Sequence, residues 1–147
     1  RSARLYRALV NTGLASSVGG FLAPTAEPFL YSIAATVAHG QAIAAVERAV
    51  LDECARMATD GPRPQEVSRV LTQLKARFVF DAGSVTDLAH QLGYFATIAT
   101  WQDWGAIHDR LAAVTPDAVL AAARRYLTAD NRTIGIFEPA NADSEAR

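Results

Sequence analysis

The chain has 147 residues, half of them hydrophobic, and a formal net charge of -1, a size that suits one domain with a core of its own. Its 14 basic residues form no block, which argues against nucleic acid as a partner, because phosphate binding needs Lys and Arg gathered on one face. No run of roughly 18 apolar residues lacks charge, so the sequence predicts no membrane span. The single cysteine, Cys54, excludes an internal disulfide and a zinc site built from several thiolates.

The chain opens with the pattern of a short helix. Its apolar stripe is Leu5, Leu9 and Val10, at the spacing of one helical face. Ser2 can cap the helix at its start. Gly13 is the residue expected where a helix ends in the left-handed conformation.

Two strands are predicted next. Residues 14–22 are poor in helix formers and contain Gly19 and Gly20, which indicate a bulge or a close backbone approach within a strand. Residues 29–37 alternate between a more apolar and a less apolar set, the period of a strand with one buried face. We expect the two strands to pair as a hairpin.

The period becomes helical after Gly40. One helix is predicted to end at Gly61, a second to begin at Pro64, and a third to be capped by Ser84 with Asp87 as its partner. The apolar stripes of these helices are, in turn, Ile43, Val46, Val50, Cys54 and Met57; Val67, Val70, Leu71, Leu74 and Phe78; and Val85, Leu88, Leu92 and Phe95.

The last third of the chain is predicted to hold two more helices and one strand. Trp101 and Trp104 are expected to pack, and a short helix is expected over residues 107–114. Thr115 caps a final helix that has Pro116 at its first position. Thr133–Phe137 is rich in β-branched and aromatic residues, which predicts a short strand.

The order of these elements predicts an α+β fold of two layers, an antiparallel sheet backed by several helices. Three strands are few for this number of helices, and the chain starts inside a helical pattern. We therefore expect residues 1–139 to be a domain whose front part lies outside this sequence. Residues 140–147 are small and polar, and a flexible tail is expected there.

No constellation of catalytic residues stands out. His39, His90 and His108 are too far apart to grip zinc in pairs from one helical face, and H-x-x-E-H occurs nowhere in the sequence. Ser16 and Ser17 have neither a nearby His or Asp nor a G-x-S-x-G setting. Cys54 lies on an apolar stripe, which favours a buried, unreactive thiol. The carboxylates are expected to be solvated on helix surfaces; they include Asp52, Glu53 and Glu66.

Several short segments, taken in order, carry a family resemblance. They are Leu5–Val10, Gly13–Val18, Gly61–Pro62, Pro64–Val67, Leu74–Ala76, Gln91–Tyr94, Val114–Asp117, Arg125–Leu127, Asn131–Thr133 and the closing Pro139. Their order and spacing resemble the later two-thirds of one domain of the insulinase/pitrilysin family of zinc peptidases, which includes bacterial zinc proteases and the mitochondrial processing peptidase. The resemblance runs from about Ala3 to Pro139.

The resemblance implies a processing-peptidase-like fold and a role. Family members form two bowl-shaped halves around a substrate chamber. One half binds zinc through H-x-x-E-H, and the other closes over the substrate, often with an Arg and a Tyr that stand seven residues apart. Leu9 and Ser16 occupy those two positions here. Leu9 is therefore expected in the core and Ser16 in an ordinary strand, and Ser16 and Ser17 become the candidate substrate-facing residues.

The leading interpretation is a non-catalytic domain of a zinc metalloendopeptidase, with no catalytic residue, metal ligand or cofactor of its own. Zinc is expected in the catalytic half of the parent protein. The expected partners are a catalytic zinc-binding domain or subunit of the same family and an extended peptide substrate, with homo-oligomers forming through an open sheet edge. Two alternatives remain: a structural or assembly subunit with no proteolytic role, and a small-ligand helical domain unrelated to peptidases.

Overall fold

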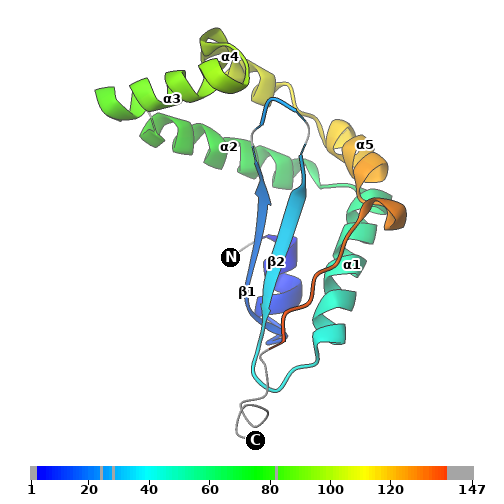
Figure 1. The fold of residues 1–147 in the computed structure, drawn as a ribbon. Helices are drawn as coiled ribbons and strands as arrows, with labels where there is room; N and C mark the ends of the chain where they lie inside the picture. Colours follow the sequence, from blue (N-terminus) through cyan, green and yellow to red (C-terminus); the bar gives the residue numbers. More distant parts are fainter. Residues whose placement is uncertain (1–2, 24, 28, 82, 139–147) are drawn as a thin grey trace, which may run out of the picture.

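The computed structural model describes residues 3–23, 25–27, 29–81 and 83–138. A two-stranded hairpin lies against one group of helices near its base, and a second group lies around the level of its tip (Figure 1). The elements in chain order are η1 (Tyr6–Val10), β1 (Ala15–Leu22), β2 (Tyr31–Val37), α1 (Ile43–Asp60), α2 (Pro64–Asp81), α3 (Val85–Ile98), α4 (Trp101–Ala112), α5 (Pro116–Tyr126) and η2 (Ala129–Asn131). No helix among the described residues is long and apolar enough to cross a membrane.

The hairpin has one face toward the helices. β1 and β2 are antiparallel, and a bulge between Ala15 and Ser17 shifts their register. The bulge matters because Ala15 and Val18 are an odd number of residues apart, so a regular strand would point them to opposite faces. With the extra residue, both join the inner face, where Ala15 is buried and Val18 packs beside it.

The core lies between η1, the base of the hairpin and α1. Its buried members are Leu9, Ala15 and Val46. α5 crosses α1, and the Arg124 guanidinium donates to the carbonyls of Ala58 and Thr59 at 3.0 and 3.3 Å, groups that the end of α1 leaves without helical partners. The core thus forms around the first strand and the helices before and after the hairpin.

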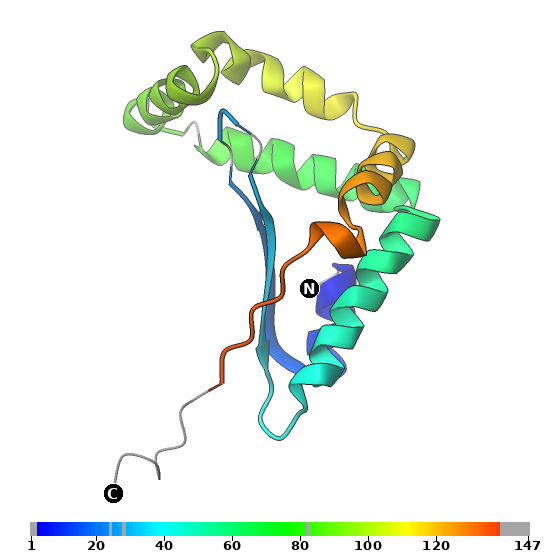
Figure 2. The ribbon, with the colours of Figure 1, turned by 45° about the vertical axis from the view of Figure 1, so that its right-hand side comes forward.

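Helices α2, α3 and α4 form a separate layer. α2 runs away from the end of α1, and α3 and α4 fold back beside it as a helical hairpin (Figure 2). The Ser84 hydroxyl accepts from the Asp87 N–H at 3.0 Å, as its capping pattern predicted. α4 begins at Trp101 because the Thr100 N–H and hydroxyl both donate to the Asp103 carboxylate, at 3.1 and 2.6 Å.

The structure confirms the α+β fold class, the hairpin and the main helices. α2 starts at Pro64 and α5 at Pro116 after its Thr115 cap, as expected. Gly13 and Gly61 adopt φ of 75° and 69° where their helices end. Gly20 makes the close approach predicted for the glycine pair, since a Cβ there would lie 2.6 Å from the Tyr31 hydroxyl, whereas the bulge falls earlier, at Ser16.

Three expectations were wrong. Thr133–Phe137 forms no strand, because residues 132–138 are exposed and pair with neither β1 nor β2. α4 begins well before residue 107, since the Thr100 cap fixes its start. Trp101 does not pack: it is 58% exposed and lies at the very start of α4. Trp104, one turn later, is the residue that contacts Phe78 of α2 and Phe95 of α3.

Some predictions fall on residues outside the described part of the chain. They are the helix cap at Ser2, the end of the domain at residue 139 and the flexible tail at residues 140–147. These remain predictions.

Candidate functional site

The candidate site is the start of β1, where the bulge presents two serines. Ser16 and Ser17 are both exposed. The Ser16 hydroxyl donates to the Thr36 carbonyl at 3.3 Å, and the Ser17 hydroxyl donates to the Thr36 hydroxyl at 3.0 Å. The two side chains therefore rest on the outer face of β2. Neither donates to a His or a carboxylate, the contact that would activate a serine nucleophile.

The outer face of the hairpin around these serines is shallow. The residues there are Ser16, Ser17, Gly19, Ala34 and Thr36, all exposed and small. Small side chains let another backbone approach closely. This face can therefore accommodate an extended chain, but it offers no deep pocket for a particular side chain.

The edges of the hairpin supply hydrogen-bonding groups. β1 and β2 pair with each other, and the described residues contain no third strand in this sheet. Each strand thus has one edge that no described strand covers. Such an edge carries main-chain N–H and C=O groups that can bind another extended chain.

Leu9 belongs to the same core cluster as Ala15, the residue of β1 that precedes the two serines. It is completely buried, which confirms that the position is part of the core. The turn that holds it is π-helical, with the Asn11 N–H donating to the Tyr6 carbonyl at 3.1 Å. Wide turns of this kind are rare and often occur near functional sites. The side chain of Arg7 is 57% exposed and contacts Glu66 at 3.9 Å, so it is turned toward α2.

An ion-pair cluster anchors η1 to the junction of α1 and α2. Arg4 donates to both carboxylate oxygens of Glu66 at 3.2 and 2.7 Å and to the Gly61 carbonyl at 2.8 Å. Glu66 also accepts from the Arg63 N–H at 2.8 Å. The Arg4 hydrogen bond, followed by the Arg63 backbone bond, lowers the pKa of Glu66 to about 2.

The expectation of solvated surface carboxylates was therefore wrong for Glu66, whose side chain is 19% exposed. It was also wrong for Glu53, which is 13% exposed and pairs with Arg56 at 2.6 Å. Sequence reasoning missed the Arg4 contact because the two residues are 62 positions apart. A local signal existed only for Arg56, three residues from its partner.

The histidines and the cysteine occupy scattered places. His39 lies in the exposed turn after β2, His90 is exposed on α3, and His108 packs edge-on against Phe78 with ring centroids 5.2 Å apart. Cys54 is half-buried, and burial raises the pKa of its thiol, which favours the unreactive form. In the part of the chain that the structure describes, no three His, Cys, Asp or Glu side chains gather closely enough to hold a metal ion.

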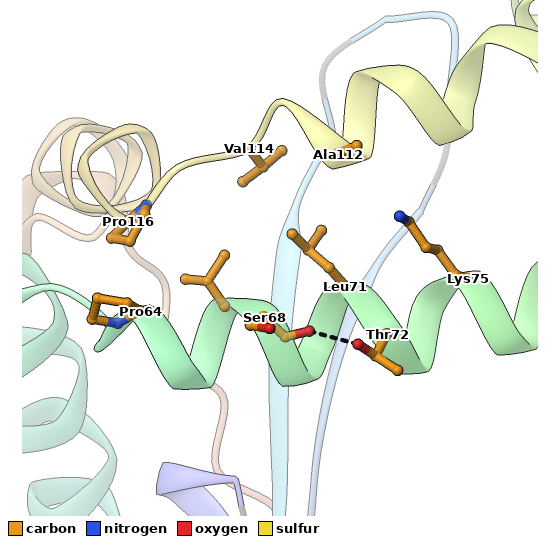
Figure 3. Close-up of a pocket in the computed structure, with 9 residues that line it drawn as sticks. Pro64, Ser68, Leu71, Thr72, Lys75, Ala112, Val114 and Pro116 are labelled. Carbon is orange, nitrogen blue, oxygen red and sulfur yellow. Dashed lines mark hydrogen bonds between the residues drawn. The ribbon is translucent and has the colours of Figure 1, made fainter.

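A groove of about 350 Å³ lies between α2 and the segment that joins α4 to α5 (Figure 3). Its lining residues are mostly aliphatic, with one cation: Pro64, Val67, Ser68, Leu71, Thr72, Lys75, Ala112, Val114 and Pro116. The prolines lie at one end and Lys75 at the other. The Thr72 hydroxyl donates to the Ser68 carbonyl at 3.0 Å, but the exposed lining of the groove is about as polar as it is apolar.

Comparison with known proteins gives two kinds of match. The family model described as the peptidase M16 inactive domain matches residues 1–74. A crystal structure of a predicted zinc protease from Bordetella pertussis Tohama I is 25% identical, with a TM-score of 0.84 over 94% of this chain and 77% of that chain. The inactive peptidase domain of a predicted zinc protease from Bordetella parapertussis is 26% identical, with a TM-score of 0.86 over 96% of this chain and 77% of that chain. No curated protein sequence matches the chain.

Proposed function

Because this chain belongs to the peptidase M16 inactive-domain family, we propose that it forms the non-catalytic half of the substrate chamber of a zinc metalloendopeptidase and helps to hold an extended peptide there. The family match and the two structural relatives confirm the resemblance to the insulinase/pitrilysin family. The peptide-holding role rests on one observation of the structure, an edge of β1 that no described strand covers, beside a shallow outer face.

The means of holding a peptide is strand addition. Main-chain groups on an uncovered strand edge bind an extended chain with little regard to its side chains. Ser16 and Ser17 lie at the start of β1, and their hydroxyls can exchange their bonds to Thr36 for bonds to a bound peptide. Small neighbours on the outer face impose little side-chain selection. The domain would therefore contribute affinity for the peptide main chain. The choice of cleavage site would depend more on the catalytic partner than on this domain.

The partner in this proposal is a catalytic zinc-binding domain or subunit of the same family. Zinc and the water that it activates belong to that half, since this sequence contains no H-x-x-E-H. This chain would supply a wall of the chamber and a surface that keeps the peptide extended.

Peptide binding can be measured by fluorescence anisotropy with a labelled, unstructured peptide. We expect weak binding that is lost when alternate backbone nitrogens of the peptide are methylated, because methylation removes the donors that strand addition needs. Ser17→Val should weaken binding, whereas the same change at Ser32, which is on β2 and exposed, serves as the matched control. Equal binding of the methylated and unmethylated peptides would contradict strand addition.

The catalytic role is tested separately with fluorogenic peptides and added zinc. The isolated chain should show no turnover that a chelator abolishes. Mixing the chain with a zinc-binding partner of the family should raise the turnover of that partner. Chelator-sensitive cleavage by the isolated chain would refute the assignment as a non-catalytic domain.

One observation favours the second candidate function, a structural or assembly subunit without a proteolytic role. The hairpin tip exposes a group of large apolar residues that resembles a protein-binding surface: Phe21, Leu22, Phe29, Leu30 and Tyr31 are each more than half exposed. The two functions differ in what the chain associates with. Association with a subunit that has an intact H-x-x-E-H supports the peptidase role, and association only with subunits that lack the motif supports the scaffold.

A further inference from the structure

The helical hairpin formed by α3 and α4 is set apart from the protein core. Neither helix contains a buried residue. α2 contains no buried hydrophobic residue either, but its first turn is held to Arg4 through Glu66. The buried hydrophobic residues of the described chain lie elsewhere, in η1, β1, α1 and α5. Figures 1 and 2 both show α3 and α4 beyond α2 as seen from α1. Helices with few buried apolar contacts are the parts of a protein that open most readily.

A single side chain of α2 makes the aromatic contacts between that helix and α4. The Phe78 ring lies 5.2 Å from the Trp104 ring and 5.2 Å from the His108 ring, both on α4. Within the hairpin itself, Phe95 of α3 lies edge-on to Trp104 at 5.5 Å. α3 and α4 therefore hold each other, and Phe78 fastens the pair to α2.

The hairpin is joined to the rest of the chain through short connections. Gly83 is exposed, and Ser84 caps α3 immediately after it. At the other end, α4 stops at Ala112, and Thr115 caps α5 three residues later, its hydroxyl accepting from the Ala118 N–H at 3.1 Å. Because each helix starts at its own cap, bending is confined to these joints while the helices stay intact.

The groove described above lies at the second joint. Leu71 and Lys75 belong to α2, whereas Ala112 and Val114 belong to the end of α4 and its connection to α5. Figure 3 shows the two sets facing each other. A rotation of the α3–α4 hairpin about its joints would therefore change the width of the groove.

We infer that the α3–α4 hairpin is a hinged arm, fastened to α2 by Phe78, whose movement opens and closes the groove between α2 and the α4–α5 connection. The two aromatic contacts of Phe78, one tilted and one edge-on, favour the closed arm by roughly ten- to a hundredfold, so the open form is a minor but accessible state. The arm moves without disturbing the core, because none of the buried hydrophobic residues lies on it.

Hydrogen–deuterium exchange of the full 147-residue chain tests the arm. In the unmodified protein, amides of α3 and α4 should exchange roughly tenfold or more faster than those of α1 and α2, which lie on the other side of the joints. Phe78→Ala should accelerate exchange in α3 and α4 by about a further tenfold and leave α1 unchanged. The matched control is Phe80→Ala, which removes the same ring from the same helix at a position that is 80% exposed; it should leave exchange in α3 and α4 as it is.

Fluorescence keeps the inference testable if Phe78→Ala fails to fold. Trp101→Phe leaves Trp104 as the sole tryptophan, in the ring cluster that fastens the arm. In that background, the milder Phe78→Leu should increase acrylamide quenching of Trp104 more than Phe80→Leu does. If the amides of α3 and α4 exchange as slowly as those of α1, the inference that these helices form a hinged arm is refuted. Exchange of α2 at the same rate as α3 and α4 would also overturn it, since the whole layer would then open together.

Discussion

Replacing Glu66 by Gln tests how strongly the ion-pair cluster holds η1 to the helices. The substitution keeps the shape of the side chain and an oxygen that can still accept from the Arg63 N–H. It removes the charge that pairs with Arg4 at 2.7 Å. Arg4 then retains the Gly61 carbonyl as a full partner, so the change isolates the electrostatic part of the contact.

The expected magnitude follows from the pKa of Glu66, which folding lowers from 4.5 to about 2. A shift of that size corresponds to roughly 3 kcal/mol if it is fully expressed in the free energy of unfolding. Both side chains keep about a fifth of their surface in solvent, at 20% and 19% exposure. Screening therefore reduces the contribution, and we expect Glu66→Gln to cost about 1–2 kcal/mol at pH 7.

The dependence on pH gives the sharper readout. Because the pKa of Glu66 is lower in the folded state, its stabilisation is complete above the unfolded value near 4.5 and is lost as the pH falls toward about 2. Urea unfolding between pH 6 and pH 2.5, followed by circular dichroism, should show the wild-type protein losing stability over this range. The Gln variant should lose less, so the two curves should converge at low pH.

The matched control is Glu53→Gln, which breaks the pair of neighbouring helical residues Glu53 and Arg56. The Arg56 side chain is 58% exposed, and such a pair contributes about 0.3–0.5 kcal/mol. If Glu66→Gln costs no more than this control, or if its stability falls with pH as steeply as that of the wild-type protein, the anchoring role of the cluster is refuted.

Three further predictions concern the core, a helix start and the hairpin. Leu9→Ala should lower the free energy of unfolding by about 3 kcal/mol, because Leu9 is fully buried; a loss below about 1 kcal/mol in urea titrations would show that the site tolerates the cavity. Thr100→Ala should cost about 1 kcal/mol and speed amide exchange in the first turn of α4, and unchanged exchange there would contradict the role of its contacts with Asp103. The chain should self-associate through the hairpin, so the mass from light scattering should rise with concentration and fall again in Phe21→Lys, whose position is 65% exposed; a monomer at high concentration would count against this.

Local signals predicted most of the elements. Pro64, Ser84 and Thr115 each act on residues within one helical turn, so the sequence alone places the starts of α2, α3 and α5. The start of α4 carries the same kind of local signal in Thr100 and Asp103. Thr133–Phe137 has strand-forming residues, but a strand also needs a partner with free backbone groups, and local composition does not supply one.

The sequence predicted only part of the candidate site. The family resemblance points to Ser16 and Ser17, and both are exposed at the bulge. Their shared partner, Thr36, is about 20 residues away, and the pairing register decides it. The groove is formed by α2 and the α4–α5 connection, two segments whose approach no periodic pattern predicts.

The sequence by itself determined the family, the α+β class, the helical stripes and the burial of Leu9. These depend on residue order and on periodicity, which act over a few positions. Only the tertiary structure decided which stripes become core: α1 buries Val46, whereas α3, with an equally apolar stripe, buries nothing. It also decided that Glu66 meets Arg4 and that Phe78 of α2 contacts Trp104 and His108 of α4. A stripe shows that a helix has an apolar face, but burial depends on which distant segment covers that face, and this is set by the packing of the whole chain.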